Sequence, residues 1–462
     1  MQQHIQTYLA AFALLAPVTF AHDLADAVTP QGVRAHMAAF QRVADANGGT
    51  RAAATPGYAA SVRYVERTLR GAGYTVRRQP FTFTFSETLA QTGRVLGNGT
   101  HLTPIIMEGS PSTPAAGLEA PLSVPAAPLG CDAEDFAQTR GTVVLVERGT
   151  CTFATKAQHA AQAGVAAVLV YNEAAAPATD SFSGSLGDSG VEPGAAVGVQ
   201  PGTVPTAGLT RAEGERLREQ LQQGDVRVAL DLRVVTEERT TANVIAELPG
   251  GGSGDAQIVM LGAHLDSVAE GPGINDNGSG SALVLELALK LAQTGRAEGA
   301  RFAFWGAEEL GLLGSAHYVA ELSPTELRNI RAYLNFDMVS SPNAAPFVYG
   351  DPALTALFTE TFTAENLTLL PDALGGRSDH APFEAAGVPV AGLFSGAEGS
   401  KSLGETRSYG GTVVAAYDGC YHEACDTLAH TDTPTARRYL DLMADAAAEA
   451  LQTLLEETVA KR

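Results

Sequence analysis

The segment Val259-Met-Leu-Gly-Ala-His264-Leu-Asp266-Ser267 begins as a run of apolar and small residues and ends in polar ones. Such a run predicts a buried strand in a sheet that is covered on both faces. In open α/β sheets, sites form beyond the carboxyl ends of the strands. His264 stands at that position, and imidazole is a good zinc ligand. Asp266 is well placed to hydrogen-bond the second ring nitrogen of a ligating histidine.

An alternation of strands and helices surrounds this segment from about residue 235 onward. The predicted strands are Asn243–Leu248, Gln257–Gly262, Arg301–Trp305, Arg331–Phe336, Pro346–Tyr349 and Pro389–Phe394. The predicted helices are Ser279–Gln293, Leu312–Glu321, Pro352–Glu365, His380–Ala386 and Thr433–Thr453. Buried strands between helices predict an α/β fold with a mixed, mostly parallel sheet flanked by helices.

Further polar residues follow other predicted strands or lie in loops. Asp276 ends a glycine-rich loop, which lets the backbone approach an ion closely. Glu308 and Glu309 come directly after a buried strand, and adjacent side chains point in different directions. Asp337 ends another strand, and His422 lies in a short loop between two cysteines.

Each of these residues has an ordinary structural role to set against metal binding. Asp276 could cap a helix, and Glu308 and Glu309 could be the acidic start of one. Together with His264, however, the set supplies two histidines and three carboxylates, which suits two divalent ions bridged by one carboxylate. Nitrogen and oxygen ligands without thiolate favour zinc, with Co²⁺ or Mn²⁺ as substitutes, whereas a Ca²⁺ site does not follow from the sequence.

A family resemblance rests on motifs that occur in a fixed order. They are Gly262-Ala-His264-Leu-Asp266-Ser267, Gly273-Ile-Asn-Asp276-Asn-Gly-Ser-Gly280, Ala307-Glu308-Glu309-Leu-Gly311, Asn335-Phe-Asp337-Met338, Gly376-Arg377-Ser378-Asp379-His380 and Cys420-Tyr421-His422. They resemble those of the M28 family of zinc peptidases, above all its secreted bacterial and fungal aminopeptidases. The resemblance covers roughly residues 40–90 and 240–455.

The resemblance implies how the ions would be held. One zinc ion would be bound by His264 and Asp337 and the other by Glu309 and His422, with Asp276 bridging them.

The resemblance also implies the catalytic and substrate-binding roles. Glu308 would activate the water that the two zinc ions share, and Asp266 would orient the first histidine ligand. Tyr421 would stabilise the oxyanion. Glu308, Asp337 and the backbone of Arg377 would hold the free α-amine of the substrate.

Residues 93–231 differ from their surroundings, because Pro, Gly, Ala and Ser become dense around a short strand–helix–strand unit. This region resembles a protease-associated (PA) domain in Gly130-Cys131, Asp135-Phe136, Val143-Val-Leu-Val-Glu-Arg148-Gly-Thr-Cys151-Thr-Phe153, Lys156, Ala163-Gly164 and Val168–Asn172. We therefore predict an inserted PA domain at 93–231 and a zinc-peptidase domain made of 22–92 and 232–462. An even number of cysteines favours disulfides, and among three connectivities we predict the local pairs Cys131–Cys151 and Cys420–Cys425.

The N-terminus and the overall charge bear on location and partners. Residues 1–21 end an apolar run with Ala21 and predict a secretory signal peptide, the alternative being an N-terminal helix. No other segment is apolar enough for a membrane span. A net charge of −21 disfavours a nucleic-acid partner. We expect a secreted protein, extracellular or periplasmic, that acts as a monomer.

These observations predict a secreted di-zinc aminopeptidase that cleaves the N-terminal bond of peptides with a free N-terminus. The resemblance favours apolar first residues such as Leu. A carboxypeptidase of the same fold is a rival, but it requires a cationic clamp for the substrate carboxylate. An inactive binding protein is a second rival, but such proteins lose metal ligands, and all five are present here.

Overall fold

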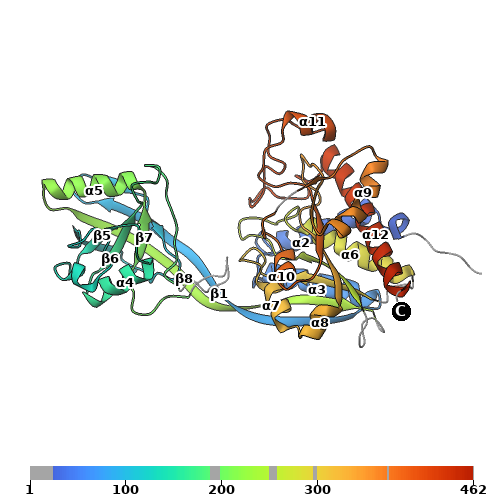
Figure 1. Ribbon diagram of the computed structural model, residues 1–462, viewed down its shortest axis with the longest axis horizontal. Coiled ribbons are helices and arrows are strands. Elements are labelled where there is room, and N and C mark those ends of the chain that lie inside the picture. The colour runs from blue at the N-terminus through green and yellow to red at the C-terminus, as the bar shows by residue number, and fades with distance from the viewer. Residues whose placement is uncertain (1–23, 188–197, 249–256, 295–298, 372–373, 461–462) are drawn as a thin grey trace, which may run out of the picture.

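The computed structural model describes residues 24–187, 198–248, 257–294, 299–371 and 374–460. The predicted signal peptide at 1–21 lies outside these residues. The chain forms two lobes joined by a long two-stranded ribbon, with the small lobe at one end and the main lobe at the other (Figure 1). We call residues 96–226 the small lobe and the rest of the described chain, apart from the ribbon, the main lobe.

The main lobe is built on one mixed sheet with the strand order β13-β12-β14-β11-β9-β10-β8-β1. The strands β9, β10, β11 and β14 run parallel to one another. β8 runs antiparallel to β10 and β1, and β12 runs antiparallel to β14 but parallel to β13. The bounds are β1 Thr75–Val95, β8 Arg227–Glu247, β9 Ile258–His264, β10 Ala300–Trp305, β11 Ile330–Phe336, β12 Phe347–Gly350, β13 Leu370–Pro371 and β14 Val390–Phe394. The predicted α/β fold with a mixed, mostly parallel sheet is confirmed.

Helices cover both faces of this sheet because alternate strand residues are apolar on each side. On one face, Val259 and Leu261 of β9 pack with α2, α3, α6, α9 and α12. On the other face, Met260 and Trp305 pack with Tyr318 of α7 and Phe383 of α10. The helices are α1 Leu24–Ala27, α2 Pro30–Asp45, α3 Pro56–Gly71, α6 Gly278–Thr294, α7 Leu313–Glu321, α8 Pro324–Asn329, α9 Pro352–Ala364, α10 His380–Ala385, α11 Leu403–Tyr409 and α12 Pro434–Ala460. Among the described residues, none of these helices combines the length and the apolar character needed to cross a bilayer.

The ribbon consists of β1 and β8, which pair antiparallel from Thr75↔Glu247 to Val95↔Val228. The alternation of polar and apolar residues from Tyr74 to Phe85 predicts a strand that ends near Phe85. β1 instead continues to Val95, because β8 pairs with it throughout. Phe81 and Phe83 of β1 form a buried cluster with Ala307, which directly precedes the predicted catalytic Glu308 and the predicted ligand Glu309. The boundaries that we predicted after residues 92 and 231 fall inside these two strands.

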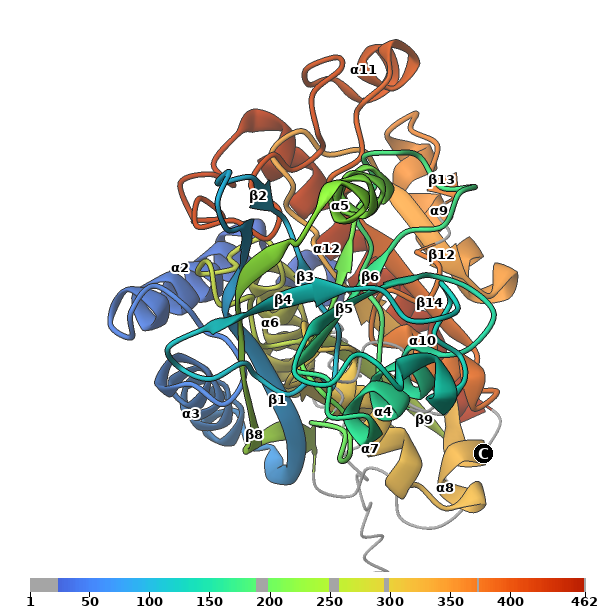
Figure 2. The ribbon, with the colours of Figure 1, turned by 90° about the vertical axis from the view of Figure 1, so that its left-hand side faces the viewer.

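The small lobe has its own core, and its strands join the ribbon because β4 (Leu118–Ser123) pairs antiparallel with β8. Its parallel strands β5 (Val143–Glu147), β6 (Ala167–Tyr171) and β7 (Thr206–Leu209) lie between α4 (Phe153–Gln162) and α5 (Arg211–Gln223), as Figures 1 and 2 show together. The remaining elements are β2 His101–Leu102, β3 Ile105–Ile106 and the 3₁₀ helix η1 Ala133–Phe136. The strand–helix–strand unit expected in this region is β5–α4–β6.

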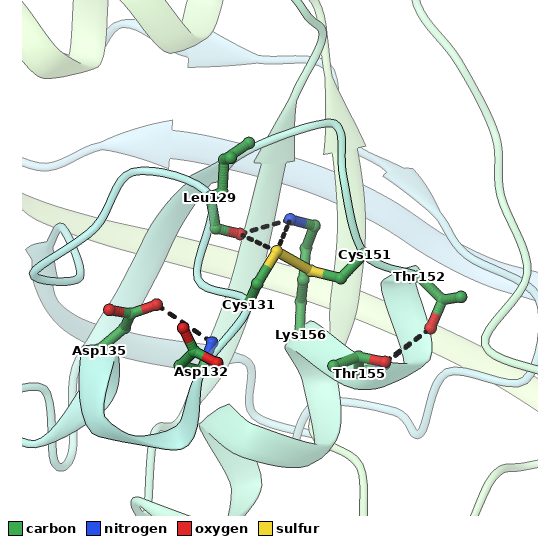
Figure 3. The surroundings of a disulfide bond; sticks show 8 residues. All are labelled: Leu129, Cys131, Asp132, Asp135, Cys151, Thr152, Thr155 and Lys156. Carbon is green, nitrogen blue, oxygen red and sulfur yellow. Dashed lines mark hydrogen bonds between the residues drawn. A yellow bond between two sulfur atoms is a disulfide. The ribbon is translucent and has the colours of Figure 1, made fainter.

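Both predicted disulfides are present, Cys131–Cys151 in the small lobe and Cys420–Cys425 in the main lobe. The first ties the chain before η1 to the start of α4 (Figure 3). The buried ammonium group of Lys156 donates to the carbonyl of Leu129 and lies 3.8 Å from the Cys131 sulfur. This corner of the small lobe is therefore held by one covalent bond and one buried cation.

We expect the double substitution Cys131→Ser, Cys151→Ser to lower the free energy of unfolding of the small lobe by about 3 kcal/mol. The two cysteines are 20 residues apart, and opening a loop of this size restores that much conformational freedom to the unfolded chain. Urea unfolding followed by circular dichroism measures the change. An unfolding midpoint equal to that of the parent protein would contradict the prediction.

Candidate metal centre

Three adjacent parallel strands bring most of the predicted site residues to one edge of the main sheet. β9 ends at His264, β10 is followed by Glu308 and Glu309, and β11 is followed by Asp337. Because these strands are neighbours in the order β11-β9-β10, their carboxyl ends meet. Asp276 precedes α6, which starts two residues later. The sequence places these side chains on separate segments, and the sheet order brings them together.

Asp276 lies between the two histidines. Its Oδ1 is 3.2 Å from Nε2 of His264, and its Oδ2 is 3.2 Å from Nε2 of His422. Asp337 Oδ1 is 3.4 Å from the same nitrogen of His264, and Glu309 Oε2 is 3.1 Å from that of His422. The ligand atoms thus form two groups, His264–Asp276–Asp337 and Asp276–Glu309–His422, with Asp276 in both.

The charge and burial of these groups fit bound cations. Asp276 and Asp337 are buried, and the buried oxygens Glu309 Oε1 and Asp337 Oδ1 have no hydrogen-bond donor among the described residues. Burial raises the pKa of Glu309 to about 8 and that of Glu308 well above its ordinary value. A divalent cation stabilises the ionised carboxylates that burial otherwise disfavours. The donor set consists of imidazole nitrogens and carboxylate oxygens, which are ligands that zinc accepts.

Asp266 is fully buried behind the ligands. Its Oδ1 lies 3.7 Å from Nδ1 of His264, which is longer than a hydrogen bond. Its two oxygens instead accept the backbone N–H groups of Glu308 and Glu309, at 3.3 and 3.4 Å. Asp266 therefore lies beside the histidine as expected, and it also anchors the loop of the two glutamates, which the sequence did not show.

The backbone next to the site adopts a conformation that L-residues avoid. Ala307 before Glu308, Met338 after Asp337 and His422 itself have φ values of 58°, 54° and 59°. Such residues cost of order 1 kcal/mol or more and persist where the surroundings fix them. Their position beside the ligand atoms indicates that the fold holds these side chains in set directions.

Ser378 is a residue whose function in the site we did not predict. Its hydroxyl donates to Asp337 Oδ2 at 2.6 Å, and it accepts a hydrogen bond from Asn335 Nδ2 at 2.9 Å. Asn335 in turn accepts from the Tyr333 hydroxyl, which accepts from Trp305 Nε1. This buried chain fixes the carboxylate of Asp337. The only sign of this role in the sequence is that Ser378 stands within the motif Gly376-Arg377-Ser378-Asp379-His380.

Arg51 and Asp426 also support the site without belonging to the predicted set. The fully buried Arg51 donates to the carbonyls of Leu265, Pro272 and Gly273, which flank the segments carrying the ligands. Asp426 accepts the backbone N–H group of Asp276 at 2.9 Å. Both act on backbone groups of residues distant in the chain, so no local pattern could have shown them.

A cavity of about 620 Å³ opens at the candidate ligand groups. Tyr421 lies on its wall, and its ring stacks on the imidazole of His422 at 3.8 Å between centroids. Arg377 donates to the Tyr421 hydroxyl at 3.3 Å and pairs with Glu398 at 3.0 Å. Glu308 lies on the same wall, 3.8 Å from His264 Nε2. All the predicted catalytic residues except the buried Asp266 line this cavity.

Comparison with protein families agrees with the two-lobe architecture. Residues 243–447 match the model of peptidase family M28, and residues 118–217 match the PA domain model. The first match covers the main lobe from β8 to α12, and the second covers the small lobe from β4 to α5.

Individual proteins agree with the family matches. The chain is 40% identical over 434 residues to an aminopeptidase from Pseudomonas aeruginosa, covering 87% of this chain and 77% of the relative. It is 36% identical over 430 residues to leucine aminopeptidase 2 from Trichophyton rubrum, covering 90% and 82%. The crystal structure of BSAP, a zinc aminopeptidase from Bacillus subtilis, aligns with a TM-score of 0.63 at 28% identity over 92% of this chain and 95% of that chain. The chain therefore belongs to peptidase family M28, among the metallo-aminopeptidases of that family that carry a PA domain.

Proposed function

We propose that the chain is secreted, binds two zinc ions and hydrolyses the N-terminal peptide bond of peptides, with a preference for apolar first residues such as Leu. The observation that supports this most directly is the position of Asp276, whose two oxygens each face a different histidine at 3.2 Å. Each histidine has one further carboxylate beside it, so the geometry suits two ions that share one ligand.

His264 and Asp337 would hold one ion, Glu309 and His422 the other, and Asp276 both. When bound, the zinc ions would act as Lewis acids toward the scissile carbonyl and the attacking water. The chain's own contribution is to keep the ligand directions fixed through Ser378, which holds the Asp337 carboxylate, and Asp426, which holds the backbone of Asp276.

Glu308 is the residue that we propose moves the proton. It lies on the cavity wall beside the ligands but belongs to neither group of ligand atoms. Its carboxylate would accept a proton from the attacking water and deliver it to the leaving amine. Burial raises the pKa of Tyr421, which keeps its hydroxyl protonated and able to donate to the developing oxyanion.

The cavity also supports the choice of substrate. Glu308 and Asp337 would face the α-ammonium group of the peptide, together with the backbone of Arg377. Met338, Leu374 and Phe394 line the same cavity and offer apolar surface to the first side chain. A relative named leucine aminopeptidase is consistent with that preference.

Secretion is supported by the sequence and the disulfides. The N-terminal 21 residues carry an apolar run that ends in a small residue. Two disulfides are typical of an oxidising compartment outside the cytosol.

We expect hydrolysis of leucine p-nitroanilide but not of its N-acetyl form, because acetylation removes the ammonium group that the carboxylates bind. Chelation should abolish the activity, and zinc should restore it with about two ions per chain by metal analysis. Equal rates on the two substrates, or full activity in the metal-free protein, would refute the proposal.

A further inference from the structure

The cavity at the metal centre extends along β1 of the ribbon. Besides the metal-binding residues, it is lined by Thr84, Phe85, Ser86 and Thr88. Successive strand residues point to opposite faces of a sheet. Since Thr84, Phe85 and Ser86 all line one cavity, that cavity lies against the edge of β1 and not against one of its faces. β8 occupies the other edge over these residues, so the cavity lies against the edge that points away from β8.

The hydrogen bonds of β8 show which backbone groups of β1 point to this edge. Val234, the partner of Thr88, donates its N–H to the Ser112 hydroxyl at 2.9 Å, and its carbonyl accepts from the same hydroxyl at 3.0 Å. Both groups of Val234 therefore point away from β1, which makes Val234 and Thr88 a non-hydrogen-bonded pair. In such a pair, the N–H and C=O of Thr88 also point away from β8.

The pair at the other end of this stretch agrees. Pro80 has no N–H to donate to its partner Ala242, and the carbonyl of Ala242 accepts from the Tyr58 hydroxyl at 2.7 Å. The register is continuous from Pro80 to Thr88. Alternation therefore directs the N–H and C=O groups of Thr84 and Ser86 to the same edge as those of Thr88.

This edge is accessible over a limited length. In the described chain, β2 pairs with β1 only at Gly93 and Arg94, and no strand pairs with this edge between residues 75 and 92. A bulge between Thr88 and Ala90 interrupts the regular ladder at one end of this stretch. At the other end, Pro80 has no N–H to offer to an added strand. The regular, unpaired stretch is thus the part of β1 that lines the cavity.

We propose that this edge binds the backbone of the peptide substrate beyond its first residue, as an additional strand running parallel to β1. The proposal rests on the aminopeptidase function proposed above, and it identifies the substrate class as extended peptides of about four residues or more. Strand addition uses main-chain hydrogen bonds and is independent of the side chains. It therefore suits an enzyme that removes first residues from many different peptides.

The position of the edge supports the substrate as its occupant. The edge and the metal-binding residues line one continuous cavity. Phe83 packs against Ala307, next to Glu308, so the Thr84 end of the edge is the end near the metal centre. The span from Thr84 to Thr88 is about 13 Å at about 3.3 Å per residue, and Glu108 of the small lobe lines the same cavity.

The first test compares substrates on the unaltered, zinc-loaded protein. We expect kcat/KM for Leu-(Ala)₅ to exceed that for Leu-Ala by about tenfold. Single N-methyl groups, moved along the hexapeptide beyond the scissile bond, should lower kcat/KM by about 3- to 10-fold at every second position, because each removes one hydrogen bond. Losses without this two-residue period, or equal rates for both lengths, would overturn the proposal. Leucine p-nitroanilide, assayed on the same preparation, reports separately on the aminopeptidase function.

The second test alters the edge itself. Ser86→Pro removes an N–H that points away from β8, as the natural Pro80 does. The matched control Thr236→Pro makes the same change at the facing residue of β8, whose N–H points away from β1 and which does not line the cavity. The ratio of kcat/KM for Leu-(Ala)₅ to that for leucine p-nitroanilide should fall about 3- to 10-fold in Ser86→Pro and stay at the parent value in Thr236→Pro. Thermal unfolding checks that both variants fold, and the N-methyl series decides if Ser86→Pro does not. An unchanged ratio in folded Ser86→Pro overturns the proposal. Concentration-dependent dimerisation that Ser86→Pro abolishes without changing the ratio also overturns it, since the occupant is then a second copy of the chain.

Discussion

Replacing Glu308 with glutamine is expected to lower kcat for leucine p-nitroanilide by at least about 100-fold, while zinc content and thermal stability stay at parent values. Glutamine has nearly the same shape but cannot accept a proton, and general base catalysis contributes 10²- to 10⁴-fold. Since Glu308 belongs to neither group of ligand atoms, the metal should remain bound. Steady-state kinetics and metal analysis on one preparation measure both quantities.

A matched control for this variant is Glu384→Gln, which makes the same chemical change on α10 at an exposed position. It should keep the parent kcat. Turnover within a fewfold of the parent in Glu308→Gln would show that another group moves the proton.

Replacing Asp276 with alanine is expected to have the second largest effect, because this carboxylate belongs to both ligand groups. We expect bound zinc to fall from about two ions per chain to one or fewer. kcat/KM should fall at least about 1,000-fold, since metal ions contribute several kcal/mol of transition-state stabilisation. Metal analysis after gel filtration and the leucine p-nitroanilide assay give the two readouts.

The control for this second variant is Asp225→Ala, an exposed position in the small lobe. It should retain the zinc content and activity of the parent. Two ions per chain in Asp276→Ala would exclude the bridging role, whatever the activity.

The ligand set could be predicted because its residues stand where buried strands end. β9 is apolar up to its last residue and β11 is mostly apolar, so the histidine at the end of the first and the carboxylate after the second are conspicuous in the sequence. The same reasoning gave the order of strands and helices in the main lobe, because each element buries apolar residues at its own period.

The supporting residues could not be predicted because their contacts are distant in sequence. Arg51 acts on carbonyls more than 200 residues away, and the Ser378 hydroxyl reaches Asp337 across 41 residues. The local pattern around Arg51 does not differ from that of an ordinary surface arginine, and the motif around Ser378 does not show which residue its hydroxyl contacts. The length of β1 was missed for a related reason, since its second half is stabilised by pairing with β8 and has few buried side chains of its own.

The antiparallel pairing of β1 and β8 has a consequence for how such a chain could be assembled. The chain enters and leaves the small lobe next to two ribbon residues that face each other, Val95 and Val228. The segment between these two residues connects two adjacent antiparallel strands, as the loop of a hairpin does. Its insertion therefore leaves the strand order of the main sheet unchanged. Shortening that hairpin to a tight turn would preserve the connectivity of the peptidase. In the same way, an unrelated module with adjacent termini could replace the small lobe without rethreading the rest of the molecule.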